Sequence, residues 1–317
     1  MVTVQQPRKL NNLAMEAIRR MTLEQLRIFV AVATRLHVTQ AARELNLTQS
    51  AASAAIATLE AQYRTLLFHR IGRRIELTEA GRLFLDEARA VLQRTDEAEL
   101  MLSELAGIRR GKLAVAASQT ISNYWLPPVL WRYRQHYPDI AIALSIGNTE
   151  HVANVILAGT AELGFIEGAV DHPALRQNDI ALDELALVVA PGHRWTAIAP
   201  TGPKDLAAGP WVLREAGSGT RQVFEADLAA LGLGAADLVV ALELPSNEAV
   251  CSAVEAGAGA TVVSHSVVAA SLEAGRLRRI PLDLPPRRYA LVRHGERYLS
   301  RAAQALQSLI LRGAPDG

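Results

Sequence analysis

The sequence predicts an α/β protein with an N-terminal, all-α-type winged helix-turn-helix head, a long linker helix and a two-lobed α/β domain. Three observations support this prediction. Two short helical segments joined by a three-residue turn lie near residue 46 and precede an arginine-rich hairpin. A heptad-spaced seam of apolar residues follows. Beyond it, strand and helix patterns repeat with an offset of 98 residues, which favours two related lobes.

Length and composition exclude several classes of protein. The chain has 317 residues, 50% hydrophobic and 21% charged, which suits two or three domains with sizeable cores and excludes general disorder. No uncharged apolar run approaches the roughly 18 residues of a membrane span, and residues 1–20 lack the pattern of a secretory signal. The single cysteine, Cys251, excludes an internal disulfide and a Cys-rich zinc site. We therefore expect a cytoplasmic protein.

Charge is unevenly distributed. Residues 1–82 hold 12 Lys and Arg against 6 Asp and Glu, a net charge of +6, whereas residues 83–317 carry a net charge of −5. A basic head on an acidic body favours contact between the head and a polyanion. An ordinary solvated surface is the alternative interpretation.

The first sharp pattern begins at Met21. Residues 22–25, Thr-Leu-Glu-Gln, form a capping box before a helix over about 23–34. We expect Thr39 to cap a helix over 40–45 and Thr48 to cap a longer helix over 49–62, in a helix-turn-helix. An ordinary helical hairpin is the alternative. Short polar side chains near the start of a recognition helix suit base edges and phosphates, and the candidates are Thr39, Gln40, Thr48, Gln49, Ser50 and Ser53.

Residues 66–78 predict two short strands around a glycine turn. Arg70, Arg73 and Arg74 lie near its tip. Guanidinium groups on a hairpin beside a helix-turn-helix are typical of a wing that contacts the DNA backbone or the minor groove. The sequence therefore predicts that these arginines bind double-stranded DNA.

A long helix is expected from Thr78 to about Ala106. Its apolar seam steps alternately by four and three residues, through Phe84, Ala88, Val91, Thr95, Ala98, Leu102 and Leu105. A long isolated helix is marginal in water unless its seam is buried. We expect dimerisation through this helix, with packing on its own body as the alternative, and a hinge over 107–111.

The remaining sequence alternates strands and helices. We expect mainly parallel strands at 112–117, 140–146, 163–166, 185–190, 239–244 and 261–264. The segment from Ala143 matches the segment from Ala241 as strand, polar cap, helix, glycine and strand. Two similar lobes are implied, with a cleft at the carboxyl ends of their strands as the natural ligand site.

Four loops that precede helices carry small polar side chains suited to a ligand. Amides at helix N-termini bind anions, and arginine adds a charge-assisted fork. We expect a small anionic or carboxylate effector, although helix capping explains each loop taken alone. Glu167, expected at the cleft mouth, would repel an anion or select an amino or hydroxyl group. The candidates are Ser118, Gln119, Thr120, Asn148, Thr149, Glu167, Arg214, Ser218, Thr220, Arg221 and Ser246.

Other functions fit the residues less well. Residues 217–219 do not form a nucleophile elbow, and residues 217–221 lack the lysine of a P-loop. The eight histidines show no metal-ligand spacing. We therefore expect no enzyme, cofactor or metal site. A two-lobed small-molecule binding protein and a redox sensor using Cys251 are the alternatives, but Cys251 lies mid-helix among apolar residues and is better interpreted as structural.

The head resembles the LysR-type transcriptional regulators. The similarity is carried by LEQLRIFVAVA (23–33), TQAARELNLTQSAASAAIATLE (39–60) and LLFHRIGRRIELTEAG (66–81). The body is similar to the effector domain of that family, particularly a CysL-like branch, through ISNYWLPPVLWRYRQHYPDI, ELGFIEG, LREAGSGTRQVFE and LELPSNEAV. Where many relatives carry Arg, Lys or Gln in the recognition helix, this chain has Ala54, Ala55 and Ala57.

Residues 1–20 show no clear element, and we expect them to form an N-terminal extension. The resemblance implies three parts after it: a winged helix-turn-helix DNA-binding domain (21–78), a linker and dimerisation helix with its hinge (79–110), and a two-lobed effector-binding domain similar to periplasmic binding proteins (111–317). It further implies a dimer of dimers that bends promoter DNA, responds to a small-molecule co-inducer and acts as an activator with autorepression. RNA polymerase is a further candidate partner.

Overall fold

The structure, a computed structural model, describes residues 21–71, 74–105 and 111–313. The chain divides into two compact units, residues 1–102 and 103–317. The expected N-terminal extension (1–20), Arg73 at the hairpin tip and most of the expected hinge (107–110) lie outside the described residues. No helix among the described residues is long and apolar enough to cross a membrane.

The head contains helices α2 (Leu23–Arg35), α3 (Val38–Glu44) and α4 (Gln49–Tyr63), then the antiparallel hairpin of β1 (Phe68–Ile71) and β2 (Arg74–Leu77). The predicted capping box of Thr22 and Gln25 is present. Thr48 caps α4 as predicted, since its hydroxyl accepts from the amide of Ala51 at 3.2 Å. The prediction for Thr39 is wrong, because α3 begins earlier and His37 Nδ1 accepts from the amide of Gln40 at 3.4 Å.

A half-buried carboxylate on α4 joins the hairpin to the head. Glu60 Oε1 accepts hydrogen bonds from the amides of Leu67 at 2.7 Å and Phe68 at 3.1 Å. Gly81 lies against the same segment, where an added Cβ would stand 2.1 Å from the carbonyl oxygen of Leu67. Only glycine permits this close backbone approach. These contacts fix the start of the hairpin relative to α4 and to the long helix α5 (Glu79–Leu105).

The first residues of the predicted seam on α5 pack against the helices of the head. Phe84 contacts Phe29 at a ring-centroid distance of 4.9 Å, and Ala88 is buried in the same cluster. Val91 and Leu102, further along the seam, are exposed at 43% and 63%. The first turns of the seam therefore pack on the helices of the head, whereas Val91, Ala98 and Leu102 are exposed.

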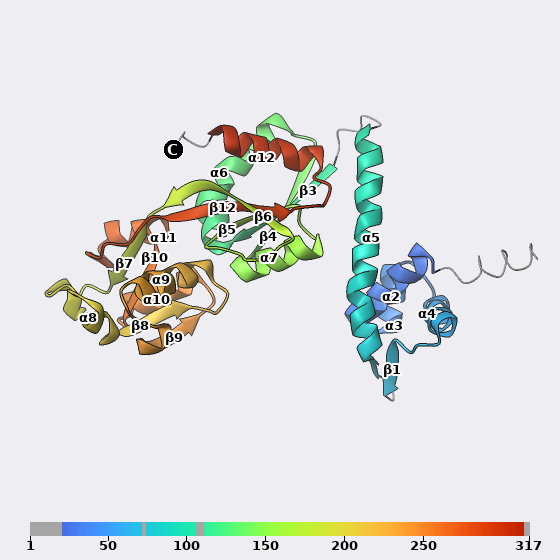
Figure 1. Cartoon of the computed structure of the whole chain (residues 1–317), viewed down its shortest axis with the longest axis horizontal. Helices are drawn as coiled ribbons and strands as arrows, with labels where there is room; N and C mark the ends of the chain where they lie inside the picture. Colours follow the sequence, from blue (N-terminus) through green and yellow to red (C-terminus); the bar gives the residue numbers. More distant parts are fainter. Residues whose placement is uncertain (1–20, 72–73, 106–110, 314–317) are drawn as a thin grey trace, which may run out of the picture. The chain divides into compact units, whose positions relative to one another are not determined.

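The second unit has two lobes, each built on a five-stranded sheet (Figure 1). The sheet of lobe I has the order β4-β3-β5-β12-β6, with strands β3 (Gly111–Ser118), β4 (Ile140–Gly147), β5 (Leu163–Glu167), β6 (Leu175–Asp183) and β12 (Arg287–His294). Its helices are the π-helical turn η1 (Ile121–Trp125), α6 (Leu126–His136), α7 (Thr149–Ala158) and α12 (Arg301–Gly313).

Lobe II repeats this plan. Its sheet has the order β11-β7-β10-β8-β9, with strands β7 (Leu185–Val189), β8 (Pro210–Arg214), β9 (Val239–Leu244), β10 (Ala260–Ser264) and β11 (Arg278–Ile280). Its helices are α8 (Pro203–Ala207), α9 (Gly219–Ala230), α10 (Asn247–Glu255) and α11 (His265–Glu273), with 3₁₀ turns η2 (Arg194–Thr196) and η3 (Ala235–Asp237). In each lobe the repeated segment supplies an edge strand, β4 or β9, and the helix after it.

The expectation of mainly parallel strands is wrong for part of both sheets. The strand pairs β3–β4, β3–β5, β8–β9 and β8–β10 are parallel, whereas β12 runs antiparallel to β5 and β6, and β7 runs antiparallel to β10 and β11. Each lobe thus receives a strand from a chain segment that crosses between the lobes. These two crossings, at Asp183–Leu185 and at residues 281–286, form the hinge between the lobes, which is distinct from the hinge expected over 107–111.

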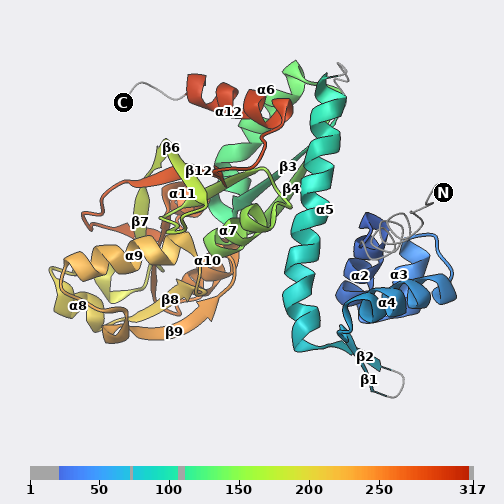
Figure 2. The same ribbon diagram turned by 45° about the vertical axis from the view of Figure 1, so that its right-hand side comes forward.

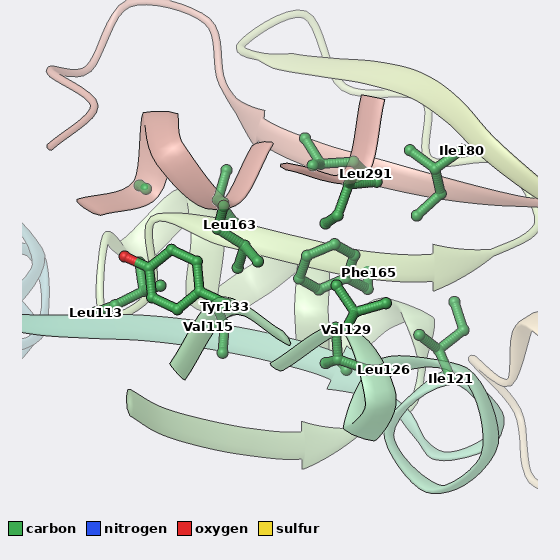
Figure 3. Close-up of a cluster of buried hydrophobic side chains, with 14 of the residues drawn as sticks. Leu113, Val115, Ile121, Leu126, Val129, Tyr133, Leu163, Phe165, Ile180 and Leu291 are labelled. Carbon is green, nitrogen blue, oxygen red and sulfur yellow. The ribbon is translucent and has the colours of Figure 1, made fainter. Parts of the chain in front are cut away.

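Apolar side chains fill both faces of the sheet in lobe I. Leu163, Phe165 and Leu291 project from the sheet toward Leu126 and Val129 of α6 (Figure 3). A separate cluster packs α7 on the opposite face, and Figure 2 shows α7 on the side of the sheet away from α12. The sheet is therefore held between two helical layers, and the loops at the carboxyl ends of its parallel strands have fixed positions.

Candidate functional sites

The first candidate site is the exposed start of α4. Ala52, Ile56 and Leu59 are buried in the head as predicted, so the opposite face of the helix is turned outward. Thr48, Gln49 and Ser50 are exposed, and Ser53 is half-buried.

The side chains of this first turn bond to one another. Thr48 Oγ1 lies 3.0 Å from Ser50 Oγ, and Gln49 Nε2 donates to Ser53 Oγ at 3.0 Å. These bonds hold short hydrogen-bonding groups in fixed positions at the positive end of a helix dipole, where base edges and phosphates can be contacted.

The other DNA-binding candidates lie on α3 and the hairpin. In the first turn of α3, Thr39 is half-buried and Gln40 is exposed. Arg70 pairs with Ile75, and Ile71 with Arg74, so both arginines belong to the antiparallel hairpin as the sequence indicated. Arg73 lies outside the described residues.

The second candidate site is the interlobe junction, where the loops at residues 118–120 and 148–149 of lobe I meet those at 214–220 and 246–247 of lobe II. Asn247 is fully buried there. Its amide donates to Gln119 Oε1 at 2.9 Å, and its Nδ2 donates to Thr120 Oγ1 at 3.1 Å. Buried polar groups of the two lobes thus satisfy one another directly.

A second set of contacts crosses the interlobe junction through Arg214 and Glu215. The guanidinium of Arg214 donates from Nη1 to Asn247 Oδ1 at 2.7 Å and binds both carboxylate oxygens of Glu215. From the opposite lobe, Asn148 Nδ2 donates to Glu215 Oε1 at 3.2 Å. Burial raises the pKa of Glu215, but the bonds from Arg214 outweigh it and hold that pKa below its usual range. Glu215 is therefore a carboxylate at neutral pH.

The third group of polar residues lies at the hinge. Arg287 is 3% exposed, and its Nε donates to Asp183 Oδ2 at 2.6 Å while its Nη1 donates to Thr220 Oγ1 at 2.8 Å. Its Nη2 stands 3.9 Å from Glu167 Oε1. The position expected for Glu167 is wrong, because its carboxylate is 2% exposed and lies at the hinge instead of at a cleft mouth.

Several predicted ligand residues serve as caps or lie in ion pairs. Ser246 Oγ accepts from the amide of Ala249 at 3.0 Å, which caps α10, and Asn148 Oδ1 accepts from the amide of His151 at 2.9 Å, which caps α7. Arg221 binds Glu225 and Glu243 at 2.7 and 2.6 Å. For these residues helix capping or ion pairing accompanies any ligand role.

Three further predicted residues, Ser118, Thr149 and Ser218, lie near the carboxyl ends of the parallel strands. Thr149 Oγ1 donates to the carbonyl of Glu167 at 2.9 Å. A Cβ on Gly219, beside Ser218, would stand 2.1 Å from that same carbonyl oxygen. Ser118 Oγ is buried and makes no hydrogen bond among the described residues. The first residues of α7 and α9, one helix from each lobe, therefore meet at the end of β5.

The candidate residues from sequence leave out four members of these networks: Asp183, Glu215, Asn247 and Arg287. Glu215 and Asn247 adjoin predicted residues within the same loops, so position alone was a usable signal. Arg287 follows two prolines and begins an apolar run, and a charged residue at the start of a buried strand is itself a signal for a buried partner.

Cys251 has the properties predicted for a structural thiol. It is 9% exposed and packs with Val250 and Val254. Burial, with a contribution from Glu248, raises the pKa of its thiol to about 12. The described residues contain no group of three His, Cys, Asp or Glu side chains that could hold a metal ion.

Comparison with known proteins agrees with both units. Residues 23–82 match the bacterial regulatory helix-turn-helix protein model of the lysR family, and residues 106–315 match the LysR substrate binding domain. The chain is 37% identical over 283 residues to the HTH-type transcriptional regulator YeiE of Escherichia coli strain K12, covering 89% of this chain and 94% of that protein. It is 34% identical over 295 residues to a probable RuBisCO transcriptional regulator of Nostoc sp., covering 92% and 88%.

A solved structure shares the same architecture. Full-length CbnR, crystallised with its target DNA, matches with a TM-score of 0.67 and 25% sequence identity, over 92% of this chain and 99% of that chain. A helix-turn-helix joined to a two-lobed substrate-binding domain defines a DNA-binding transcriptional regulator with an effector-binding domain. The chain belongs to the LysR family of bacterial transcriptional regulators, which confirms the family resemblance. The named relatives are regulators, not enzymes.

Proposed function

We propose that this regulator binds duplex promoter DNA through the first turns of α3 and α4 and through the arginines of the hairpin. The observation that carries the proposal is the polar cluster at the start of α4, in which exposed Thr48, Gln49 and Ser50 and half-buried Ser53 bond to one another opposite a buried apolar face. The crystallisation of CbnR with its target DNA supports it. The alanines at 54, 55 and 57 leave base contacts to this cluster, and a methyl group there suits thymine.

We further propose that the molecule acts as a dimer joined through the exposed seam of α5, and that two dimers form a tetramer. Val91 and Leu102 supply apolar surface that a second α5 would cover. A small co-inducer that carries a carboxylate binds at the interlobe junction and shifts the arrangement of the lobes, which changes the spacing of the dimers and the bend of the DNA. We propose that the regulator then activates transcription, with RNA polymerase as a further partner. Within its family we place the protein in a CysL-like branch.

A redox-sensor role is less well supported. Cys251 is buried with a raised thiol pKa, which keeps the thiolate fraction small at neutral pH. The ligand-responsive interpretation of the two lobes is therefore preferred.

The DNA-binding proposal is tested with the full chain and a labelled duplex that carries the region upstream of its own gene. Gln49→Ala and Ser53→Ala are expected to lower affinity for this duplex toward that for random duplex, because they remove the base-contacting groups. Thr58→Ala, on the same helix but with a hydroxyl bonded to its own backbone, is the control and keeps the preference. Equal losses on specific and random DNA for Gln49→Ala and Ser53→Ala would contradict base readout.

A further inference from the structure

The guanidinium of Arg214 already holds a carboxylate from its own chain. Nε and Nη2 donate to Oε2 and Oε1 of Glu215 at 2.8 and 2.9 Å, which is the two-pronged geometry that arginine offers to a free carboxylate. Consecutive residues of an extended strand point to opposite faces, so adjacency alone does not bring these side chains together. The contact forms because β8 ends at Arg214 and the chain turns, with the amide of Ser218 donating to the carbonyl of Glu215 at 3.2 Å.

The opposite lobe closes over the same carboxylate. Asn148 Nδ2 donates to Glu215 Oε1 at 3.2 Å and to the carbonyl of Ala216 at 3.4 Å, and the amide of Glu150 donates to the carbonyl of Gly217 at 3.3 Å. One carboxylate is thus held by an arginine of lobe II and an amide of lobe I. A carboxylate ligand between the lobes would accept hydrogen bonds from the same donors.

The two partners of this ion pair differ in freedom. Arg214 lies at the end of a buried strand with its side chain 5% exposed, and Asn247 Oδ1 fixes its remaining nitrogen. The side chain of Glu215 is 24% exposed and lies in a loop that continues through Ala216, which is exposed, and Gly217, whose φ is +82°. The carboxylate is therefore the partner that can leave while the guanidinium stays in place.

The other described arginines at the interlobe junction and the hinge are also paired. Arg221 binds Glu225 and Glu243, and Arg287 binds Asp183. An anion that enters must therefore compete with a carboxylate of the protein. Among these ion pairs, the one between Arg214 and Glu215 combines a fixed cation, a partly exposed carboxylate and a donor from the other lobe.

We propose that Glu215 is a specificity-determining residue that occupies the place of the ligand carboxylate, so that a carboxylate ligand binds by displacing the Glu215 side chain from Arg214 and Asn148. The inference rests on the proposed function, because it concerns the effector site of the regulator. A tethered group competes at an effective concentration on the order of millimolar or above. Glu215 therefore excludes anions that bind through a carboxylate alone and favours ligands that make further contacts.

The test compares the full wild-type chain with Glu215→Gln and Glu215→Ala. The affinity of each for sodium acetate and sodium malonate is measured by tryptophan fluorescence, against sodium chloride at the same ionic strength. Both variants free the Arg214 fork, and both are expected to lower the apparent Kd for acetate by about tenfold or more, since the internal competitor is removed. Two variants of different size guard against a folding defect in one of them. Glu243→Gln, which removes a carboxylate from Arg221 in the same lobe, is the matched control and leaves the Kd unchanged.

An apparent Kd for acetate that both Glu215 variants share with the wild type would overturn the inference, and so would a gain of equal size in Glu243→Gln. Binding of a labelled duplex by the same preparations separates this outcome from failure of the proposed function. If the variants bind the duplex but gain no affinity for acetate, only the inference that a ligand displaces Glu215 is overturned. A wild-type chain that binds no duplex would overturn the proposed function itself.

Discussion

Replacing Arg287 by methionine tests whether the buried ion pairs hold the hinge together. The change removes the cation that neutralises Asp183 and lies beside Glu167, while it keeps a long apolar side chain in the space. Both carboxylates are nearly inaccessible, at 7% and 2% exposure. Breaking a buried pair by removal of one partner leaves an uncompensated charge, which costs about 3–5 kcal/mol. The lost hydrogen bond to Thr220 belongs to the same network, so it is included in this range.

The neighbouring residue provides a control within the same strand. Arg288 pairs with Asp179 at 2.7 Å, but their side chains are 68% and 48% exposed. An exposed pair contributes about 1 kcal/mol or less, so Arg288→Met is expected to change stability little.

The assay is urea unfolding followed by tryptophan fluorescence, which reports on the α/β unit because all four tryptophans lie between residues 125 and 211. A loss in Arg287→Met no larger than that in Arg288→Met would refute the role given to the hinge network.

Three other predictions concern the DNA contacts, the interlobe junction and the cysteine. Arg73→Ala combined with Arg74→Ala is expected to weaken binding to all duplexes and to reduce the slope of log affinity against log salt by about 2, measured by anisotropy; an unchanged slope would exclude the hairpin from phosphate contact. Thr120→Val and Ser218→Ala are each expected to abolish any melting-temperature shift that a screen of small carboxylates finds in the wild type, while DNA affinity is retained; shifts that survive in both would remove these residues from the ligand site. Alkylation of Cys251 by iodoacetamide is expected to be slow at pH 8 in the native chain and fast in urea, because burial raises its pKa to about 12. Rapid native labelling would contradict this.

The sequence predicted most of the head because its signals are local. Thr22 and Thr48 cap helices through residues three positions away, and the periodic burial of Ala52, Ile56 and Leu59 follows from helical geometry alone. Thr39 failed as a cap because His37 provides an equivalent acceptor two residues earlier. Both His37 and Thr39 have a side chain that can cap a helix, and the sequence pattern does not show which of them does so.

The mixed sheets could not be predicted in the same way. In strand β6 the buried Leu175 is followed by four exposed polar residues, Arg176 to Asp179, so the strand lacks the apolar run of a buried strand. Its partner β12 is distant in sequence and becomes a neighbour only after the chain returns from lobe II. The pairing of Arg287 with Asp183, 104 residues apart, depends on that return.

The sequence predicted which loops form the interlobe junction, but it did not predict the hydrogen bonds that join the two lobes there. The four loops do converge, because the 98-residue repeat places equivalent helices after equivalent strands in both lobes. The capping pattern identified Asn148 and Ser246 for their type and position, but it could not show that Glu215 and Asn247 would complete bonds between the lobes. Position beside predicted residues could have identified Glu215 and Asn247, but the bonds themselves arise from the approach of the two lobes and cannot be read from either loop alone.

The most direct test of the whole interpretation is selection of binding sites by the full chain from a pool of random duplexes at moderate salt. We expect one enriched motif with two similar half-sites, spaced by about one helical turn or a multiple of it, because a two-fold dimer presents two copies of α4. Recovery of duplexes with no motif beyond the input composition would contradict sequence-specific recognition by the head.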